Sequence, residues 1–258
     1  MYYWYVFNNR ELLVLRTAGG DYEVPCTEEC PVPGESAVLD VPVGDMICKA
    51  VMLKDKADIT CGEWIPVRRS LDVLSANHAS NAFKALEMLD WNSQTLYCGH
   101  CGSRQVLKTK ISKYCPQCEV ETWAKLSPAV IAVICREDEI LLVKSKTVRR
   151  DCYVLISGFV ELGESLEECL HREVKEETGL KIKNIRYFGS QAWPFPRNVM
   201  VGYIAEYDSG ELCFQEEEIE SGGWFRYDAL PQIPDRISIS RQLIDAWVCE
   251  REKIARSH

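Results

Sequence analysis

The sequence has no hydrophobic run long enough to cross a membrane. Its amino terminus, MYYWYVFNNRELLVLR, starts with aromatic residues but reaches Arg10 and Glu11 too soon for a spanning helix. The same segment lacks the basic leader and the cleavage site of a secretory signal peptide. We therefore expect a soluble chain.

The sequence also lacks an excess of basic residues, because its 258 residues carry a formal net charge of −9 at pH 7. An acidic chain is poorly suited to bind the phosphate backbone of nucleic acids over a broad surface. Its 13 cysteines are an odd number, and without a signal peptide they favour free thiols in a reducing compartment over a disulfide framework. We expect the protein to be cytoplasmic.

Composition and patterning divide the chain into three predicted parts. Residues 1–93 hold short apolar runs broken by glycine and proline, which predicts a β-rich domain with a connecting helix at about 77–91. Residues 94–124 are rich in cysteine and turns. Residues 125–258 alternate strand-like runs, ELCFQ among them, with a glutamate-rich helix and a last helix at about 237–253. This mixture predicts an α/β sandwich.

Two CxxC pairs indicate a metal site ahead of the last domain. Cys98 and Cys101 lie in CGHC, and Cys115 and Cys118 lie in CPQC, thirteen residues further on. Four thiolates can converge on one tetrahedral Zn²⁺, and such a closed shell leaves no position for a reacting water, so we expect one structural zinc per chain. The alternatives are disulfides, free core cysteines and iron in a rubredoxin-like site. We expect His100 at the surface.

The other nine cysteines, of which Cys249 is the last, lack this paired spacing. Four of them could form a second metal site, but we expect buried free thiols instead: Cys26, Cys30, Cys48 and Cys61. Four more fall in predicted strands or a helix, where cysteine behaves as a small hydrophobic residue: Cys135, Cys152, Cys169 and Cys213.

Residues 158–180, GFVELGESLEECLHREVKEETGL, predict a helix that is anchored at both ends. Ser165 with Glu168 forms the pattern of a capping box, and Gly179 supplies the stop. Apolar residues at four-residue spacing give this helix a face for the core.

Carboxylates at neighbouring positions of this helix indicate a cation site. Glu173, Glu176 and Glu177 would repel one another without a bound cation. Mg²⁺ takes carboxylate oxygens as ligands and shares its remaining positions with waters and phosphate oxygens. Arg172 can orient a carboxylate by a charge-assisted hydrogen bond. An ordinary solvated acidic face is the alternative.

The same segment resembles the signature of the Nudix hydrolase family, GX5EX7REUXEEXGU, in which U is a bulky aliphatic residue. Every fixed position is matched, by Gly158, Glu164, Arg172, Glu173, Val174, Glu176, Glu177, Gly179 and Leu180. The resemblance implies an α/β/α sandwich with a mixed sheet. It also implies hydrolysis of a nucleoside diphosphate linked to another moiety, with Mg²⁺ or Mn²⁺.

The resemblance further implies a role for each charged residue of the signature. Glu173 and Glu177 are the expected metal ligands, and Glu176 completes the site or serves as the general base. Glu164 is expected to support the ligands or the structure, and Arg172 to orient them. A third ligand is expected shortly before the last core strand, at Glu218, although Glu216, Glu217 and Glu220 are close in sequence.

A second motif narrows the resemblance. Residues 190–198, SQAWPFPRN, are similar to the SQPWPFPxS array of NADH pyrophosphatases, with Ala192 and Asn198 as departures. Those enzymes also carry a zinc ribbon directly before the Nudix domain. The resemblance implies that the dinucleotide pocket is lined by Gln191, Ala192, Trp193, Pro194, Phe195, Pro196, Arg197 and Asn198, with Phe159 as a stacking surface. A rigid buried turn is the alternative reading of WPFP.

Members of this type are usually homodimers in which the partner contributes an aromatic residue near the ribbon, for which Trp123 is the candidate. We expect hydrolysis of NADH to reduced nicotinamide mononucleotide and AMP, with NAD⁺ and related dinucleotides as further substrates. The alternatives are removal of the NAD cap from RNA and a non-catalytic nucleotide sensor. RNA would need a basic exit surface, which could be formed by Arg104, Lys108, Lys110 and Lys113.

Overall fold

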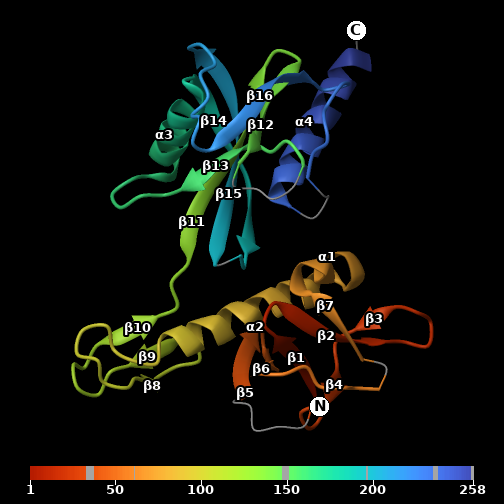
Figure 1. The fold of residues 1–258 in the computed structure, drawn as a ribbon, viewed down its shortest axis with the longest axis vertical. Coiled ribbons are helices and arrows are strands. Elements are labelled where there is room, and N and C mark those ends of the chain that lie inside the picture. The colour runs from red at the N-terminus through yellow and green to blue at the C-terminus, as the bar shows by residue number, and fades with distance from the viewer. Residues whose placement is uncertain (33–37, 61, 147–150, 196, 235–237, 257–258) are drawn as a thin grey trace. The chain divides into compact units, whose positions relative to one another are not determined.

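Two compact units make up the chain in the computed structural model, which is drawn in Figure 1. One unit comprises Met1–Lys125 together with Pro194–Arg197, and the other comprises Leu126–Trp193 together with Asn198–His258. The structure describes residues 1–32, 38–60, 62–146, 151–195, 197–234 and 238–256.

The first unit is built on a seven-stranded sheet, which confirms the predicted β-rich region. Its strands are β1 (Tyr2–Asn8), β2 (Glu11–Arg16), β3 (Tyr22–Glu23), β4 (Cys26–Thr27), β5 (Val38–Val43), β6 (Met46–Leu53) and β7 (Gly62–Pro66). They follow the order β3-β2-β1-β6-β5, with β4 paired to β1 and β7 paired to β2. The pairing of β1 with β6 is parallel.

A long helix, α2 (Ala76–Gln94), packs on this sheet after two short elements, η1 (Val67–Arg69) and α1 (Ser70–Val73). The side chain of Ser75 caps α2 by accepting a hydrogen bond from the backbone N–H of His78. Phe83 and Leu86 of α2 lie in one core with residues of β1, β2, β5, β6 and β7. The predicted connecting helix is therefore present, and it is longer at its carboxyl end than the sequence indicated.

The cysteine-rich segment adds a three-stranded sheet of β8 (Val106–Leu107), β9 (Ser112–Tyr114) and β10 (Glu121–Trp123). Lys113 of β9 is only 3% exposed, because its ammonium group donates to the carbonyl oxygens of Asn92 and Thr95 at 2.7 and 3.1 Å. A cation at the carboxyl end of a helix is stabilised by the helix dipole. The prediction that Lys113 belongs to an RNA exit surface is therefore wrong.

The second unit contains a six-stranded mixed sheet. Its strands are β11 (Ser127–Arg136), β12 (Glu139–Ser145), β13 (Ile156–Phe159), β14 (Lys181–Trp193), β15 (Asn198–Ser209) and β16 (Ile219–Arg226). The order is β14-β15-β11-β12-β16, with β13 paired to β11. The pair β11 and β15 is parallel, whereas the other pairs are antiparallel.

Strand β11 shows why this sheet is covered on both faces. Val130 and Ala132 lie in one core with α3 (Leu166–Thr178), whereas Ile131 and Val133 lie in another with α4 (Ile239–Arg256). Side chains alternate between the two faces of a strand, so an uninterrupted apolar run fits a strand that is buried on both sides. Figure 1 shows α3 and α4 on opposite faces of the sheet, which confirms the α/β/α sandwich.

None of the helices within the described residues is long and apolar enough to span a membrane.

The segment ELCFQ, residues 211–215, is not a strand as predicted. The backbone N–H groups of Cys213 and Gln215 donate to the carbonyl oxygens of Thr178 and Glu177, at 3.0 and 3.1 Å. The last carbonyls of a helix need partners from outside it, and this segment supplies them for α3. Cys213 is exposed, so the expectation that it behaves as a buried hydrophobic residue is also wrong.

Helix α3 ends at Gly179, which adopts φ of +73°. A Cβ atom at this position would lie 2.9 Å from the carbonyl oxygen of Glu211. Gly179→Ala should therefore lower the free energy of unfolding by about 1–2 kcal/mol, because left-handed backbone is costly for alanine. Chemical denaturation measures the change. Gly189→Ala is the control, since no atom lies within 4 Å of a Cβ there. Equal losses in both variants would contradict the prediction.

Candidate active site and metal centre

The acidic residues of the signature stand on a helix whose first turn is held by a capping box. Ser165 Oγ accepts from the backbone N–H of Glu168 at 3.2 Å, and the Glu168 carboxylate accepts from the backbone N–H of Ser165 at 2.8 Å. These reciprocal bonds satisfy two N–H groups that would otherwise lack partners. The positions that follow along α3 therefore have defined directions in space.

Arg172 connects the carboxylates of this helix and the preceding loop. Its guanidinium donates to both oxygens of Glu164, at 2.6 and 3.1 Å. It also donates to Glu173 at 2.8 Å, to Glu176 at 3.1 Å and to the carbonyl oxygen of Phe159 at 3.0 Å. The bonds from Arg172 lower the pKa of Glu164 to about 2. Glu164 is therefore an ionised partner of the arginine at neutral pH.

Glu173 lies directly against the backbone of β13. A Cβ atom at Gly158 would overlap the carboxyl group of Glu173, so this approach requires glycine. Burial raises the pKa of Glu173, against the opposing effect of its hydrogen bond with Arg172. The first glycine of the signature thus has a steric function, which is to admit a carboxylate beside the strand.

Glu177 is the most deeply buried carboxylate of the group, at 6% exposure. Burial raises the pKa of Glu177 to about 8, and the negative charges of Glu173, Glu218 and Glu176 act in the same direction. A buried carboxylate without a compensating charge is unfavourable. A divalent cation supplies that charge, so this donor set fits a hard metal ion.

A cavity of about 90 Å³ lies beside Glu177. Glu177, Glu218 and two serines, Ser145 and Ser157, provide its polar lining. The remaining lining residues are Val143, Val154, Leu155 and Ile219. Because a water needs about 10–15 Å³, this volume accommodates an ion with water ligands.

Glu218 is the member of the acidic run 216–220 that lines this cavity with Glu177. By contrast, Glu220 pairs with Lys144 at 3.5 Å. The backbone N–H of Lys146 donates to the carbonyl oxygen of Glu218 at 2.8 Å, which ties this position to the end of β12. These placements favour Glu218 in the register that the sequence left open, and its role as a ligand stays a prediction.

The two serines of the cavity were not singled out from the sequence. Ser157 directly precedes Gly158, so its position next to the signature could have indicated that it lies at the site. Ser145 closes the strand-like run EILLVKS, and only the pairing of β12 with β16 brings it to the cavity.

Phe159 lies at the end of β13, next to Gly158, and 53% of its surface is exposed. Its carbonyl oxygen accepts from Arg172 and from the thiol of Cys169. The backbone is thus held in place while the ring remains accessible to a planar ligand.

The residues expected to line a dinucleotide pocket fall into two groups. Gln191, Ala192, Trp193 and Asn198 belong to the unit that holds the carboxylates. The side chain of Gln191 accepts a hydrogen bond from the backbone N–H of Ile239 at 2.7 Å, and so holds the start of α4. Ala192 is exposed, Trp193 is half-buried and Asn198 is buried.

The rest of that segment, Pro194, Phe195 and Arg197, groups with the first unit. Phe195 is half-buried against the core of that unit. Pro196 lies outside the described residues. Trp123, the candidate for a residue contributed by a partner, is exposed at the end of β10.

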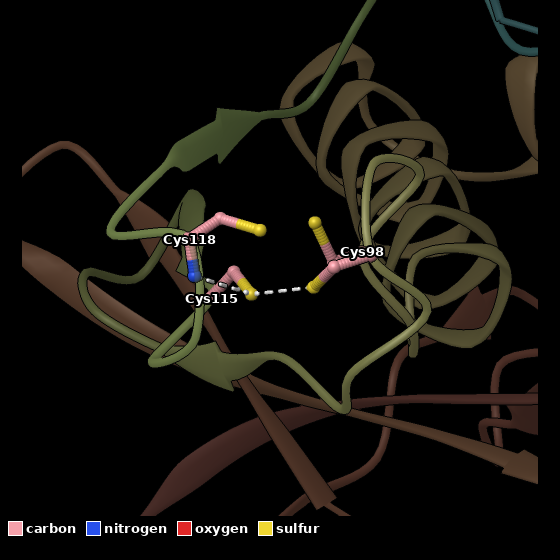
Figure 2. A group of neighbouring side chains, drawn as sticks. Cys98, Cys115 and Cys118 are labelled. Atoms are coloured by element: carbon pink, nitrogen blue, oxygen red, sulfur yellow. Dashed lines mark hydrogen bonds between the residues drawn. The ribbon is translucent and has the colours of Figure 1, made fainter.

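The four cysteines of the CxxC pairs come together as predicted. Their sulfur atoms all lie within 4.8 Å of one another. Figure 2 shows Cys98, Cys115 and Cys118 with their sulfur atoms directed toward a common centre. This is the arrangement that a tetrahedral thiolate site requires. His100 is exposed and lies outside the cluster, as expected.

The two CxxC turns repeat the same backbone pattern. The N–H of Gly102 donates to the carbonyl oxygen of Cys98, and the N–H of Glu119 donates to that of Cys115, both at 2.9 Å. Each first cysteine also accepts a backbone N–H at its sulfur at 3.4 Å, Cys98 from His100 and Cys115 from Cys118. Gly102 and Glu119 then turn the chain with positive φ values of 74° and 57°. Backbone donors favour the thiolate form of a cysteine, which is the form that binds a metal.

The remaining cysteines match the predictions in part. Cys48, Cys135, Cys152 and Cys169 are buried free thiols. Cys26 is exposed and Cys30 is half-buried, so the expectation of buried thiols is wrong for Cys26. Cys61 lies outside the residues for which a structure is described.

Comparison with known proteins adds the evolutionary context. The NUDIX domain family model matches residues 125–247. The chain is 39% identical over 219 residues to the NAD-capped RNA hydrolase NudC of Chromobacterium violaceum, an alignment that covers 84% of this chain and 78% of that protein. It is 45% identical over 166 residues to the NAD-capped RNA hydrolase NudC of Pseudomonas aeruginosa, which covers 64% of this chain and 60% of that protein.

Among solved structures, a NUDIX hydrolase from Nitrosomonas europaea superimposes with a TM-score of 0.52 at 22% identity, and the match covers 61% of this chain and 92% of that one. That likeness concerns the fold alone. The family model includes the carboxylate helix and its sheet, and the Chromobacterium relative aligns over 84% of the chain. The chain therefore belongs to the Nudix hydrolase family, in the group related to NAD-capped RNA hydrolase NudC.

Proposed function

We propose that this protein hydrolyses the diphosphate of NADH, and of NAD⁺ and related dinucleotides, to nicotinamide mononucleotide and AMP with Mg²⁺ or Mn²⁺. The observation that carries the proposal is the cavity shared by the buried Glu177 and by Glu218, with Glu173 close enough to raise the pKa of Glu177. Curated relatives named NAD-capped RNA hydrolase support the substrate class.

In this proposal the chain's own residues hold and orient the reacting groups. Glu173, Glu177 and Glu218 would bind the cation, which neutralises charge on the diphosphate and polarises water when bound. Arg172 keeps Glu173 in place through its 2.8 Å hydrogen bond. Glu176 is more exposed than Glu173 and is not among the proposed ligands, so it is the candidate for accepting a proton from water.

The base of the dinucleotide would stack on the accessible ring of Phe159, next to the carboxylates. Gln191, Ala192, Trp193 and Asn198 would contribute from the ends of β14 and β15.

NAD-capped RNA is a second candidate substrate, because its scissile diphosphate is the same and relatives carry that name. The basic surface expected to meet RNA is smaller than the sequence indicated, since Lys113 is buried and Lys108 pairs with Glu121. Turnover of free NADH and of NAD-capped RNA, compared at two salt concentrations, separates the two substrates. A non-catalytic sensor is the less favoured function, because no carboxylate of the signature is missing.

We also propose one structural Zn²⁺ bound by the four-cysteine cluster, and a homodimer to which Trp123 contributes near the partner's site. Large apolar side chains are exposed on the ribbon: Val106, Leu107, Ile111, Val120 and Trp123. Such a concentration of apolar surface is typical of an interface. Thiolate ligands must stay reduced, which is consistent with the cytoplasm as the proposed compartment.

Glu177→Gln should reduce turnover about 100-fold or more, because an amide is a poor ligand for a hard metal. The metal-free variant should unfold at no lower temperature than the wild type, since the amide avoids burial of a charge at a position where the pKa is raised to about 8. Steady-state rates and melting curves in chelator measure both effects. The control is Glu167→Gln, an exposed position on the same helix. A normal rate in the Glu177 variant would contradict its assignment as a ligand.

Cys98→Ser should lower the zinc content and the melting temperature, because the tetrathiolate site contributes to the folding of its small module. Elemental analysis of the wild type should find one zinc per chain. The control is Cys26→Ser, an exposed cysteine outside the cluster. Unchanged zinc after replacement of both Cys98 and Cys115 would rule out the site.

Phe159→Ala should raise KM for NADH about tenfold and leave KM for ADP-ribose nearly unchanged, if its ring stacks on nicotinamide. The ring is exposed, so folding should be preserved, as circular dichroism would show. Equal increases for the two substrates would assign the ring to the adenosine side instead. No increase for either substrate would exclude stacking.

A further inference from the structure

The turn between β14 and β15 contains residues that belong to the first unit. Strand β14 ends at Trp193 and β15 begins at Asn198, both in the carboxylate-bearing unit. Pro194, Phe195 and Arg197 lie between them and group with the first unit instead. Pro194, Phe195 and Arg197 are held by three separate contacts with other residues of this unit.

The first contact is made by Arg10, in the turn between β1 and β2. Its guanidinium donates to the carbonyl oxygen of Pro194 at 2.8 Å and lies 6.0 Å from the ring centre of Phe195. Asp90 of α2 pairs with the same guanidinium at 3.3 Å. A hydrogen bond from a charged donor is stronger than one between neutral groups, and Asp90 restricts where that donor can point.

The second contact is between aromatic rings. Phe195 and Phe83 of α2 meet edge to face, with ring centres 6.0 Å apart and an angle of 78° between the planes. Phe83 is buried in the core of the first unit. This arrangement is favourable for two aromatic rings and anchors Phe195 on a rigid element.

The third contact is polar. Arg197 donates to the side-chain oxygen of Gln94 at 2.6 Å. Its positive charge also favours the ionised form of Glu87, although burial dominates and raises the pKa of Glu87 to about 7. Arg197 thus bonds to one side chain of α2, that of Gln94.

The helix residues in these contacts are Phe83, Asp90 and Gln94. Glu87 lies on the same face of the helix, and the four residues are here named the α2 stripe. Their spacings of four, three and four residues place them on one face of an α-helix. One continuous face of α2, completed by Arg10, therefore contacts Pro194, Phe195 and Arg197.

We propose that Arg10, supported by the α2 stripe, is a positioning residue that orders the Pro194–Phe195 backbone and thereby sets the affinity for the dinucleotide. The inference rests on the proposed function, together with the expectation that Pro194 and Phe195 contribute to binding of the dinucleotide. A segment that is already ordered loses less conformational entropy when the ligand binds. Arg10 acts through the segment and does not touch the reacting atoms.

The test is the kinetics of Arg10→Ala in the full chain with NADH and Mg²⁺. KM should rise about tenfold, because the variant loses one charged hydrogen bond, while kcat stays within about twofold. The matched control is Arg16→Ala. Arg16 is similarly exposed and ion-paired, but its partners are Glu63 and Tyr22. A raised KM in the control, or an unchanged KM in Arg10→Ala, would overturn the proposal.

A second variant separates positioning from general stability. Gln94→Ala removes the acceptor for Arg197 and should raise KM about threefold, whereas Gln94→Glu retains an acceptor and should keep the wild-type KM. Gln94 is exposed, so both variants should fold. Equal kinetics in the alanine and glutamate variants would contradict a role for this contact.

A double-mutant cycle of Arg10→Ala with Phe195→Ala tests whether Arg10 acts through the segment. If it does, the double variant should have about the KM of the more affected single variant, whereas independent effects would multiply and would overturn positioning. Phe195→Ala alone distinguishes two claims: that the segment contributes to substrate binding, and that Arg10 positions the segment. An unchanged KM in Phe195→Ala would remove the segment from the substrate pocket. A raised KM in Phe195→Ala with a normal KM in Arg10→Ala would refute positioning alone.

Discussion

Arg172 contacts Glu164, Glu173 and Glu176, three carboxylates that would otherwise repel one another beside a strand. The arginine can hold them because the capping box and the apolar face of α3 keep the helix in one orientation. Glu177 and Glu218 line a cavity beside these residues, and the negative charges of Glu173, Glu218 and Glu176 add to burial in raising the pKa of Glu177. Arg172 therefore compensates the charge of three carboxylates, whereas its hydrogen bonds within the described residues do not include Glu177 or Glu218.

Local geometry explains why so much of this site could be predicted from the sequence. In a helix, residues three and four apart share a face, so Glu173, Glu176 and Glu177 had to lie close together once the helix was recognised. The capping pattern of Ser165 with Glu168 and the stop at Gly179 are local as well, and the structure contains both. The CxxC turns belong to the same class, since each is a short backbone pattern that repeats in Cys98–Cys101 and Cys115–Cys118.

Contacts between distant parts of the chain account for the predictions that failed. Residues 211–215 have the alternation of a strand, but their N–H groups pair with the last carbonyls of α3, and this preference depends on where the helix ends in space. Lys113 has the sequence context of a surface lysine, yet it closes the carboxyl end of α2 from 18 and 21 residues away. The hydrophobic periodicity of a short segment does not show which distant carbonyl groups that segment will bond to.

The WPFP motif contains residues that were expected to bind substrate and that also make packing contacts. Pro194 and Phe195, which match the family pattern, make the contacts with Arg10 and Phe83. Ala192, which departs from the pattern, is exposed. Packing against α2 alone would thus be enough to account for proline and phenylalanine at these positions, whatever the substrate. The motif by itself is for this reason weaker support for a nicotinamide substrate than Phe159, whose exposed ring lies beside the carboxylates and has no comparable packing function.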